Sequence, residues 1–294
     1  MSNTNNFTIT NVKLIQLAPF LETVETTLRD RFLKEADSVA RVLEIGCGPG
    51  DFALLLKDRL QDQVSITAID PSDGIEAALG KSKGNDVNFE RNDIFGFKSD
   101  EPFDLILFTK SLHHCNPVEQ ALRNAVSLLK PKGMLIAEEL DANKFATKHV
   151  EWFFDRLDLL SAAGCMQSVE ETLASAGHAK KMLTAFLDTN LPAEQRWFRP
   201  TSDQHKKSGL HRDDPEGIIA PSPLCEIVER ELGKDNIQYT YCALLYYFLT
   251  FAGLKHDETG EKVMKEFIKQ EQRAIDESII PHLGMSIIYT KPLK

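Results

Sequence analysis

The sequence lacks the features of a secreted, disulfide-bonded or membrane-spanning protein. Its five cysteines are odd in number, scattered, and never arranged as C-x-x-C, so a disulfide framework or zinc cluster is unlikely. The longest apolar run, 243–249, is far shorter than the ~20 residues that a spanning helix needs. The first six residues have neither the basic nor the apolar region of a secretory signal. These absences predict a soluble, cytoplasmic protein with no membrane partner.

The sequence also lacks an excess of basic charge. It has 44 acidic and 34 basic side chains in 294 residues, a net charge of −10. Binding to a phosphate backbone normally requires a basic face, so a nucleic-acid partner is disfavoured. The hydrophobic share of 42% fits one large domain or two small ones with an ample core.

The sequence does contain a glycine-rich turn at residues 42–50, which read V-L-E-I-G-C-G-P-G. An apolar run ends in Gly46, Gly48 and Gly50, and a helix-like run starts at Asp51. Glycine tolerates positive φ and has no Cβ, so a ligand can approach the backbone closely. A helix start adds free N–H groups and a partial positive charge. The turn therefore predicts a nucleotide-type site, although its spacing differs from the G-x-G-x-x-G of dinucleotide folds.

Three further strand-like runs end in acidic or polar residues. Residues 65–70 end at Asp70, residues 87–93 end at Asp93, and residues 103–109 precede a Leu-His-His sequence. A fifth run covers 133–140. Strands that alternate with helices predict a parallel sheet covered on both faces, and ligands bind beyond the carboxyl ends of such strands. We therefore expect these residues to converge on one edge of the sheet.

In motif order and spacing, residues 38–140 resemble the class I S-adenosylmethionine-dependent methyltransferases. The resemblance implies an α/β fold: a doubly wound, mostly parallel, seven-stranded, Rossmann-like sheet with an inserted helical cap. It also implies S-adenosyl-L-methionine as the cofactor. The domain boundaries that we expect are an N-terminal lead and helix over 1–37, a cofactor-binding core over 38–140, a helical cap over 141–222, and completion of the sheet over 223–294.

The resemblance also assigns cofactor-binding residues. Asp70 would accept hydrogen bonds from the ribose, unless it only caps the next helix, and Asp93 would face the adenine, unless it is a solvated turn acid. Glu44 would accept from loop N–H groups or act indirectly on the methionine end, and a structural role is equally open. The full set of candidates is Glu44, Gly46, Cys47, Gly48, Gly50, Phe52, Asp70, Pro71, Asn92, Asp93, Ile94, Thr109 and Lys110. For Phe52 and Ile94, core packing is the favoured alternative.

Two adjacent histidines, His113 and His114, are the candidate catalytic residues. Histidine titrates near neutral pH and can take a proton from an acceptor hydroxyl or amine. His113 is favoured marginally because it comes first after the strand, and a structural role stays open for each. His205 and His211 lie near acidic residues, but their six-residue spacing is not a ligand pattern, so no metal site is predicted.

Outside the core, the periodicity predicts a frayed lead over 1–18 and then a series of helices and strands. The helices are expected over 19–36, 149–163, 169–187, 223–232 and 256–280, and the strands over 237–249 and 284–290, as an antiparallel pair. The aromatic residues Trp152, Phe153 and Phe154 are expected to form the core of the cap. Lys132 stands where the family usually has glycine, and we expect its φ to be negative.

These patterns predict an S-adenosylmethionine-dependent methyltransferase that moves a methyl group onto an oxygen or nitrogen atom of a small-molecule acceptor. Two alternatives stay open: a protein or RNA methyltransferase, and a non-catalytic binding protein that keeps the methyltransferase fold. A nicotinamide-dependent oxidoreductase is disfavoured by the glycine spacing. The sequence specifies neither the acceptor nor the oligomeric state.

Overall fold

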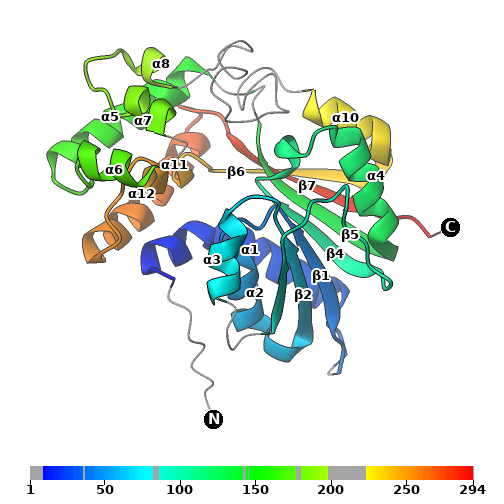
Figure 1. The fold of residues 1–294 in the computed structure, drawn as a ribbon. Helices are drawn as coiled ribbons and strands as arrows, with labels where there is room; N and C mark the ends of the chain where they lie inside the picture. The colour runs from blue at the N-terminus through cyan, green and yellow to red at the C-terminus, as the bar shows by residue number, and fades with distance from the viewer. Residues whose placement is uncertain are drawn as a thin grey trace.

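Seven strands form a single sheet at the centre of the computed structural model, which describes residues 9–35, 37–81, 86–141, 144, 146–176, 180–197 and 223–293 (Figure 1). Their order across the sheet is β3-β2-β1-β4-β5-β7-β6. The strands are β1 (Ala40–Ile45), β2 (Val64–Ile69), β3 (Val87–Glu90), β4 (Phe103–Thr109), β5 (Leu129–Leu140), β6 (Ile237–Cys242) and β7 (Gly284–Thr290). β1 to β5 are parallel, and β7 is antiparallel to both β5 and β6. The predicted doubly wound, mostly parallel sheet is confirmed.

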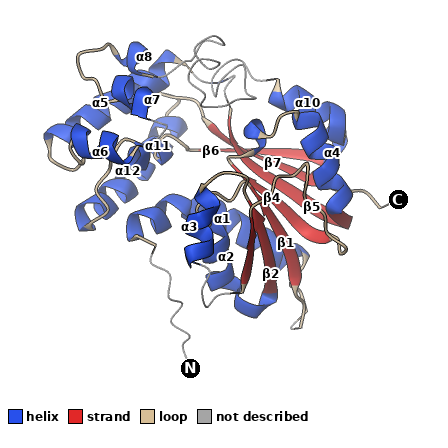
Figure 2. Cartoon of the chain, in the orientation of Figure 1, coloured by secondary structure: helices blue, strands red, loops and turns tan. Residues whose placement is uncertain are grey.

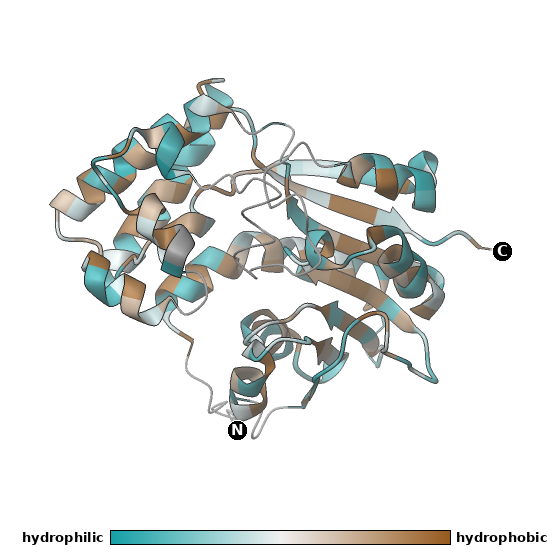
Figure 3. Ribbon diagram, turned by 45° about the horizontal axis from the view of Figure 1, so that its top comes forward, coloured by the Kyte–Doolittle hydropathy of each residue, from teal (hydrophilic) through white to brown (hydrophobic). Residues whose placement is uncertain are grey.

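Helices cover both faces of the sheet (Figure 2). One face packs against α1 (Asn11–Arg31), α2 (Asp51–Leu60) and α3 (Gly74–Lys81). The other packs against α4 (Val118–Leu128) and α10 (Leu224–Leu232). The buried strands are almost continuously apolar, as Figure 3 shows, because both of their faces are removed from water.

The remaining helices gather into a second body, here called the helical lobe (Figure 1). It comprises α5 (Thr147–Ala162), α6 (Val169–Ser175), α7 (Lys180–Phe186), α8 (Ala193–Arg196), α11 (Tyr247–Phe251) and α12 (Glu258–Asp276). The lobe has its own apolar core, in which Trp152, Phe153 and Phe154 are buried as predicted. Helices α5 and α11 follow the carboxyl ends of β5 and β6, which joins the lobe to that edge of the sheet.

Helix α1 joins the two bodies, and it starts earlier than predicted. Val12 packs in the core of the helical lobe, whereas Phe20 and Leu28 pack against the sheet. The expected frayed lead over 1–18 is therefore wrong from residue 11 onward. The helix begins there because Thr10 is its N-cap residue: the Thr10 side chain accepts a hydrogen bond from the backbone N–H of Lys13. No helix in the described ranges combines the length and apolar character of a membrane span.

The structure corrects three other expectations. The predicted strand 237–249 ends at Cys242 and gives way to α11, and the predicted helix 169–187 is divided into α6 and α7. Lys132 has a φ of +63°, not a negative one, because its N–H turns to donate to the Lys291 carbonyl, 3.0 Å away.

A buried carboxylate explains why the strand stops at Cys242. Glu271 of α12 is fully buried, and its two oxygens accept the backbone N–H groups of residues 244, 245 and 246 at 2.7–2.9 Å. Three consecutive N–H groups cannot point to one carboxylate from an extended strand, in which successive groups alternate in direction. The bend that they form delivers Tyr247 to the start of α11.

We expect Glu271→Gln to lower the free energy of unfolding by about 1–3 kcal/mol, since the amide NH₂ would leave at least one buried backbone N–H without an acceptor. Glu266→Gln on the exposed side of the same helix is the matched control and should change it by less than about 0.5 kcal/mol. Urea denaturation measures both. Equal stability of the two variants would contradict this account of the bend.

Candidate active site

The glycine loop that follows β1 is held in left-handed backbone conformations. Gly46, Gly48 and Gly50 have φ values of +73°, +51° and +77°. A Cβ at Gly46 would lie 2.4 Å from the Cβ of Ser111, and one at Gly50 would lie 2.7 Å from the ring of Phe89. A Cβ at Gly48 would meet nothing within 4 Å. The outer glycines are therefore required for packing, whereas Gly48 presents bare backbone to open space.

Asp70, directly after β2, fixes this loop. Its Oδ2 accepts the N–H of Gly48 at 2.7 Å, and its Oδ1 accepts the N–H of Ser72 at 2.8 Å. The carboxylate is buried, and it couples the tip of β2 to the middle of the glycine loop. Pro71 next to it is exposed at the same edge. The ribose contact expected for Asp70 stays a prediction.

The tip of β3 forms a tight polar turn. Asp93 is exposed, and its Oδ1 accepts the N–H groups of Phe95 and Gly96 at 2.9 and 2.7 Å. Asn92 Oδ1 accepts the N–H of Asp93 at 3.0 Å. Ile94 is buried in the core on the α4 side of the sheet. Asp93 therefore acts as an exposed acid that holds a turn, which was the alternative to an adenine contact. The adenine contact itself stays a prediction.

Glu44 is a buried acid beneath the loop. Its Oε1 accepts a hydrogen bond from Thr109 Oγ1 at 2.8 Å, whereas its Oε2 has no hydrogen-bond partner within the described part of the chain. Burial raises the pKa of this carboxyl to about 7. Cys47 is also buried, and burial raises the pKa of its thiol, so it is no nucleophile at neutral pH. Phe52 is buried against Phe20, with ring centroids 5.3 Å apart, which is a core position.

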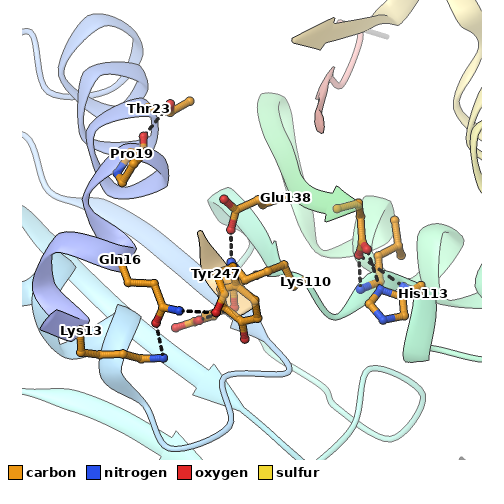
Figure 4. Close-up of polar contacts among 12 residues, drawn as sticks. Lys13, Gln16, Pro19, Thr23, Lys110, His113, Glu138 and Tyr247 are labelled. Atoms are coloured by element: carbon orange, nitrogen blue, oxygen red, sulfur yellow. Dashed lines mark hydrogen bonds and ion pairs between the residues drawn. The ribbon is translucent and has the colours of Figure 1, made fainter. Parts of the chain in front are cut away.

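Lys110, directly after β4, lies in a charged group between the sheet and the lobe (Figure 4). It forms an ion pair with Glu138 of β5, and its Nζ lies 4.8 Å from the ring centroid of Tyr247. Burial, the largest single effect, would lower the pKa of Lys110, but the combined effects of Glu138, Tyr247 and Glu139 outweigh it and the pKa is raised. Lys110 is thus a fixed cation at neutral pH.

His113 and a buried carboxylate form a second polar pair in Figure 4. His113 Nδ1 lies 2.5 Å from Glu139 Oε2, and Glu139 Oε1 accepts the N–H of Leu112 at 2.8 Å. Glu139 is 1% exposed, His113 is half-buried and His114 is exposed. A carboxylate that fixes one ring nitrogen orients the other and stabilises the imidazolium, which suits a general base.

Neither glutamate was singled out from the sequence. The available signal was a pair of acids, Glu138 and Glu139, directly after the apolar run 134–137 of β5. The described residues contain no group of three His, Cys, Asp or Glu side chains that could hold a metal ion. His205 and His211 lie outside the described residues.

We expect Gly48→Ala to fold but to bind S-adenosylmethionine at least about tenfold more weakly, because a methyl group would occupy the open face of the loop. Gly46→Ala should instead lower the free energy of unfolding by more than about 1 kcal/mol, because it adds a clash with Ser111 to the strain of a positive φ. Gly80→Ala in α3 meets nothing within 4 Å and is the control. Calorimetric titration and denaturation separate the two effects. Unchanged affinity in Gly48→Ala would contradict this interpretation of the loop.

Glu44 should make stability depend on pH. The folded state keeps this carboxyl protonated up to about pH 7, whereas the unfolded chain ionises it near 4.5, so its contribution to stability falls as the pH rises between those values. Glu44→Gln does not titrate. The free energy of unfolding of the variant, relative to that of the unchanged protein, should therefore rise by up to about 3 kcal/mol between pH 4.5 and pH 7, since one pKa unit is worth about 1.4 kcal/mol. Denaturation curves at both pH values test this, and a constant difference would contradict it.

Comparison with known proteins identifies the family of the chain. A family model described as a methyltransferase domain matches residues 20–179, more than half of the chain. An uncharacterised methyltransferase of Staphylococcus carnosus is 37% identical over 108 residues, covering 35% of this chain and 50% of the relative. A ubiquinone biosynthesis O-methyltransferase of Rickettsia conorii is 26% identical over 121 residues, covering 40% and 42%.

The chain thus spans half or less of the length of these two curated relatives. A crystal structure of the plantazolicin methyltransferase BpumL with SAH aligns over 96% of this chain and 86% of its own. Its identity of 16% and TM-score of 0.48 are too low to support an argument. The family model is sufficient by itself, and it confirms the expected family, fold class and cofactor: the chain belongs to the methyltransferase domain family, within the class I S-adenosylmethionine-dependent methyltransferases.

Proposed function

We propose that this protein transfers the methyl group of S-adenosylmethionine to an oxygen or nitrogen atom of a small-molecule acceptor, with His113 as the general base. The observation that carries the proposal is the His113–Glu139 pair, with Nδ1 and Oε2 2.5 Å apart, at the strand edge that also bears the glycine loop. The two features adjoin each other, because Ser111 Oγ donates to the Ile45 carbonyl at 2.5 Å and its Cβ faces Gly46.

The cofactor, when bound, supplies an electrophilic methyl group on a sulfonium. The glycine loop would hold the nucleoside along the bare backbone of Gly48, and Asp70 keeps that backbone in place. His113, through the ring nitrogen away from Glu139, would take the proton from the acceptor as the new bond to carbon forms. Glu139 would then stabilise the imidazolium. The bond between the methyl carbon and the sulfur would break with its electron pair left on the sulfur, which would become a neutral thioether.

A small acceptor is favoured over RNA or protein by two features. The net charge of −10 disfavours a phosphate backbone. The helical lobe is attached at the carboxyl ends of β5 and β6, the edge of the sheet that carries the site, where it would restrict the approach of a large substrate. One relative is named for O-methylation in ubiquinone biosynthesis, which is a small-molecule pathway.

We expect His113→Ala to lower the methyl-transfer rate by about 10²–10⁴-fold while S-adenosylmethionine still binds, because only proton removal is lost. Glu139→Gln should lower the rate by a smaller factor and shift the pH profile, because the amide cannot stabilise an imidazolium. His282→Ala, which removes a histidine that contacts Tyr241 of β6 at the same edge of the sheet, is the control.

The assay uses methyl-labelled cofactor and metabolite extracts, separated by size after the reaction. Label is expected in the small-molecule fraction. Label in protein or RNA instead would contradict the small acceptor, and binding of the cofactor without any transfer would favour the non-catalytic alternative. Full turnover by His113→Ala would contradict the role of the base.

A further inference from the structure

Three lysines lie near one another beside the site, and two of them form direct ion pairs with carboxylates. Lys81 pairs with Asp51, the first residue of α2, and Lys110 pairs with Glu138. The third lysine, Lys13 of α1, takes part in no ion pair within the described part of the chain, although Asp51, Lys81 and Lys110 all act on it electrostatically. Lys13 is therefore the one of these three lysines that has no direct ion pair among the described residues.

Lys13 is held in place by the protein. Its Nζ donates to Gln16 Oε1 at 2.9 Å, and it lies 5.8 Å from the ring centroid of Tyr247 (Figure 4). The Gln16 amide is fixed in turn, because its Nε2 donates to the Tyr247 carbonyl at 2.8 Å and to Thr250 Oγ1 at 2.6 Å. With both amide donors used, the amide oxygen must face Lys13.

The position of Lys13 is costly unless an anion binds there. The side chain is half-buried, and burial lowers the pKa of Lys13, with the like charges of Lys110 and Lys81 adding to that effect. An ammonium has three donors, and within the described residues Gln16 provides the one hydrogen-bond acceptor that Lys13 contacts. A pre-positioned cation with unused donors is what an anion subsite requires.

The ligand group that fits is a carboxylate. A single negative charge balances the one unpaired lysine, whereas a phosphate would bring a second charge against Asp51 and Glu138, which are already neutralised by their own partners. We propose that Lys13 is the cationic member of a carboxylate subsite formed by α1, α11 and the first turn of α2. The proposal rests on the proposed function, since two molecules at this site could bring a carboxylate: the amino-acid end of the cofactor, or an acidic acceptor.

The test compares the protein with Lys13→Met, which keeps most of the apolar stem, and Lys13→Arg, which keeps the charge. Lys265→Met on the exposed side of α12 is the matched control. In the first arm, calorimetry measures binding of S-adenosylmethionine and of its decarboxylated form. If the cofactor supplies the carboxylate, the unchanged protein should prefer the intact form by roughly 10–100-fold, as a charge-assisted hydrogen bond would give. Lys13→Met should abolish the preference, and Lys13→Arg should retain part of it.

In the second arm, protein saturated with S-adenosylhomocysteine is titrated with benzoate and with neutral benzamide as probes. If an acidic acceptor supplies the carboxylate, benzoate should bind, benzamide should not, and Lys13→Met should abolish benzoate binding. Carboxylate-selective, Lys13-dependent binding in either arm supports the subsite. If Lys13→Met changes selectivity in neither arm, the proposal is overturned.

Failure of the proposed function would look different. The cofactor would then bind without methyl transfer, or neither form of it would bind, whatever residue stands at position 13. The benzoate titration, run on the free protein, would still decide whether Lys13 selects a carboxylate. Circular dichroism of each variant confirms that any loss of binding does not come from unfolding.

Discussion

The site depends on the hydrogen bond between the Asp70 carboxylate and the backbone N–H of Gly48. Glycine adopts the positive φ of Gly46, Gly48 and Gly50 without steric cost but adopts many other conformations as readily, so the loop keeps one shape only when its surroundings fix it. Asp70 fixes its centre, and the packing of Gly46 on Ser111 and of Gly50 on Phe89 fixes its ends. The result is a fixed stretch of bare backbone above Glu44, whose carboxyl group is buried and weakly acidic.

The same strand edge carries two polar pairs, Lys110–Glu138 and His113–Glu139. Glu138 and Glu139 are neighbours on β5 and therefore point to opposite faces, one toward Lys110 and the other toward His113. Lys110 and Glu138 lie with Tyr247 beside α1 and the helical lobe, whereas His113 belongs to η2 (Leu112–His114). Helix α1 and the bend held by Glu271 bring the lobe to this edge, so the lobe contributes to the site as well as to its own core.

Local patterns made much of this predictable. The glycine loop, the acids at the tips of β2 and β3 and the first five strands are visible because each depends on residues close in sequence. The end of β6 was not predictable, since Glu271, the residue that bends the chain, is about thirty positions away and looks like any glutamate of an amphipathic helix. The start of α1 was missed because Val12, in its first turn, packs into the core of the lobe, which is formed by residues far away in the sequence. The His113 partner was missed because it depends on the alignment of β4 with β5.

A crystal structure with S-adenosylhomocysteine bound tests the central claim most directly. We expect the nucleoside to lie along Gly48 with its sulfur facing His113, and the glycine loop to keep its present backbone conformation. Density for the nucleoside at another place, or a loop that must rearrange to admit it, would contradict the account.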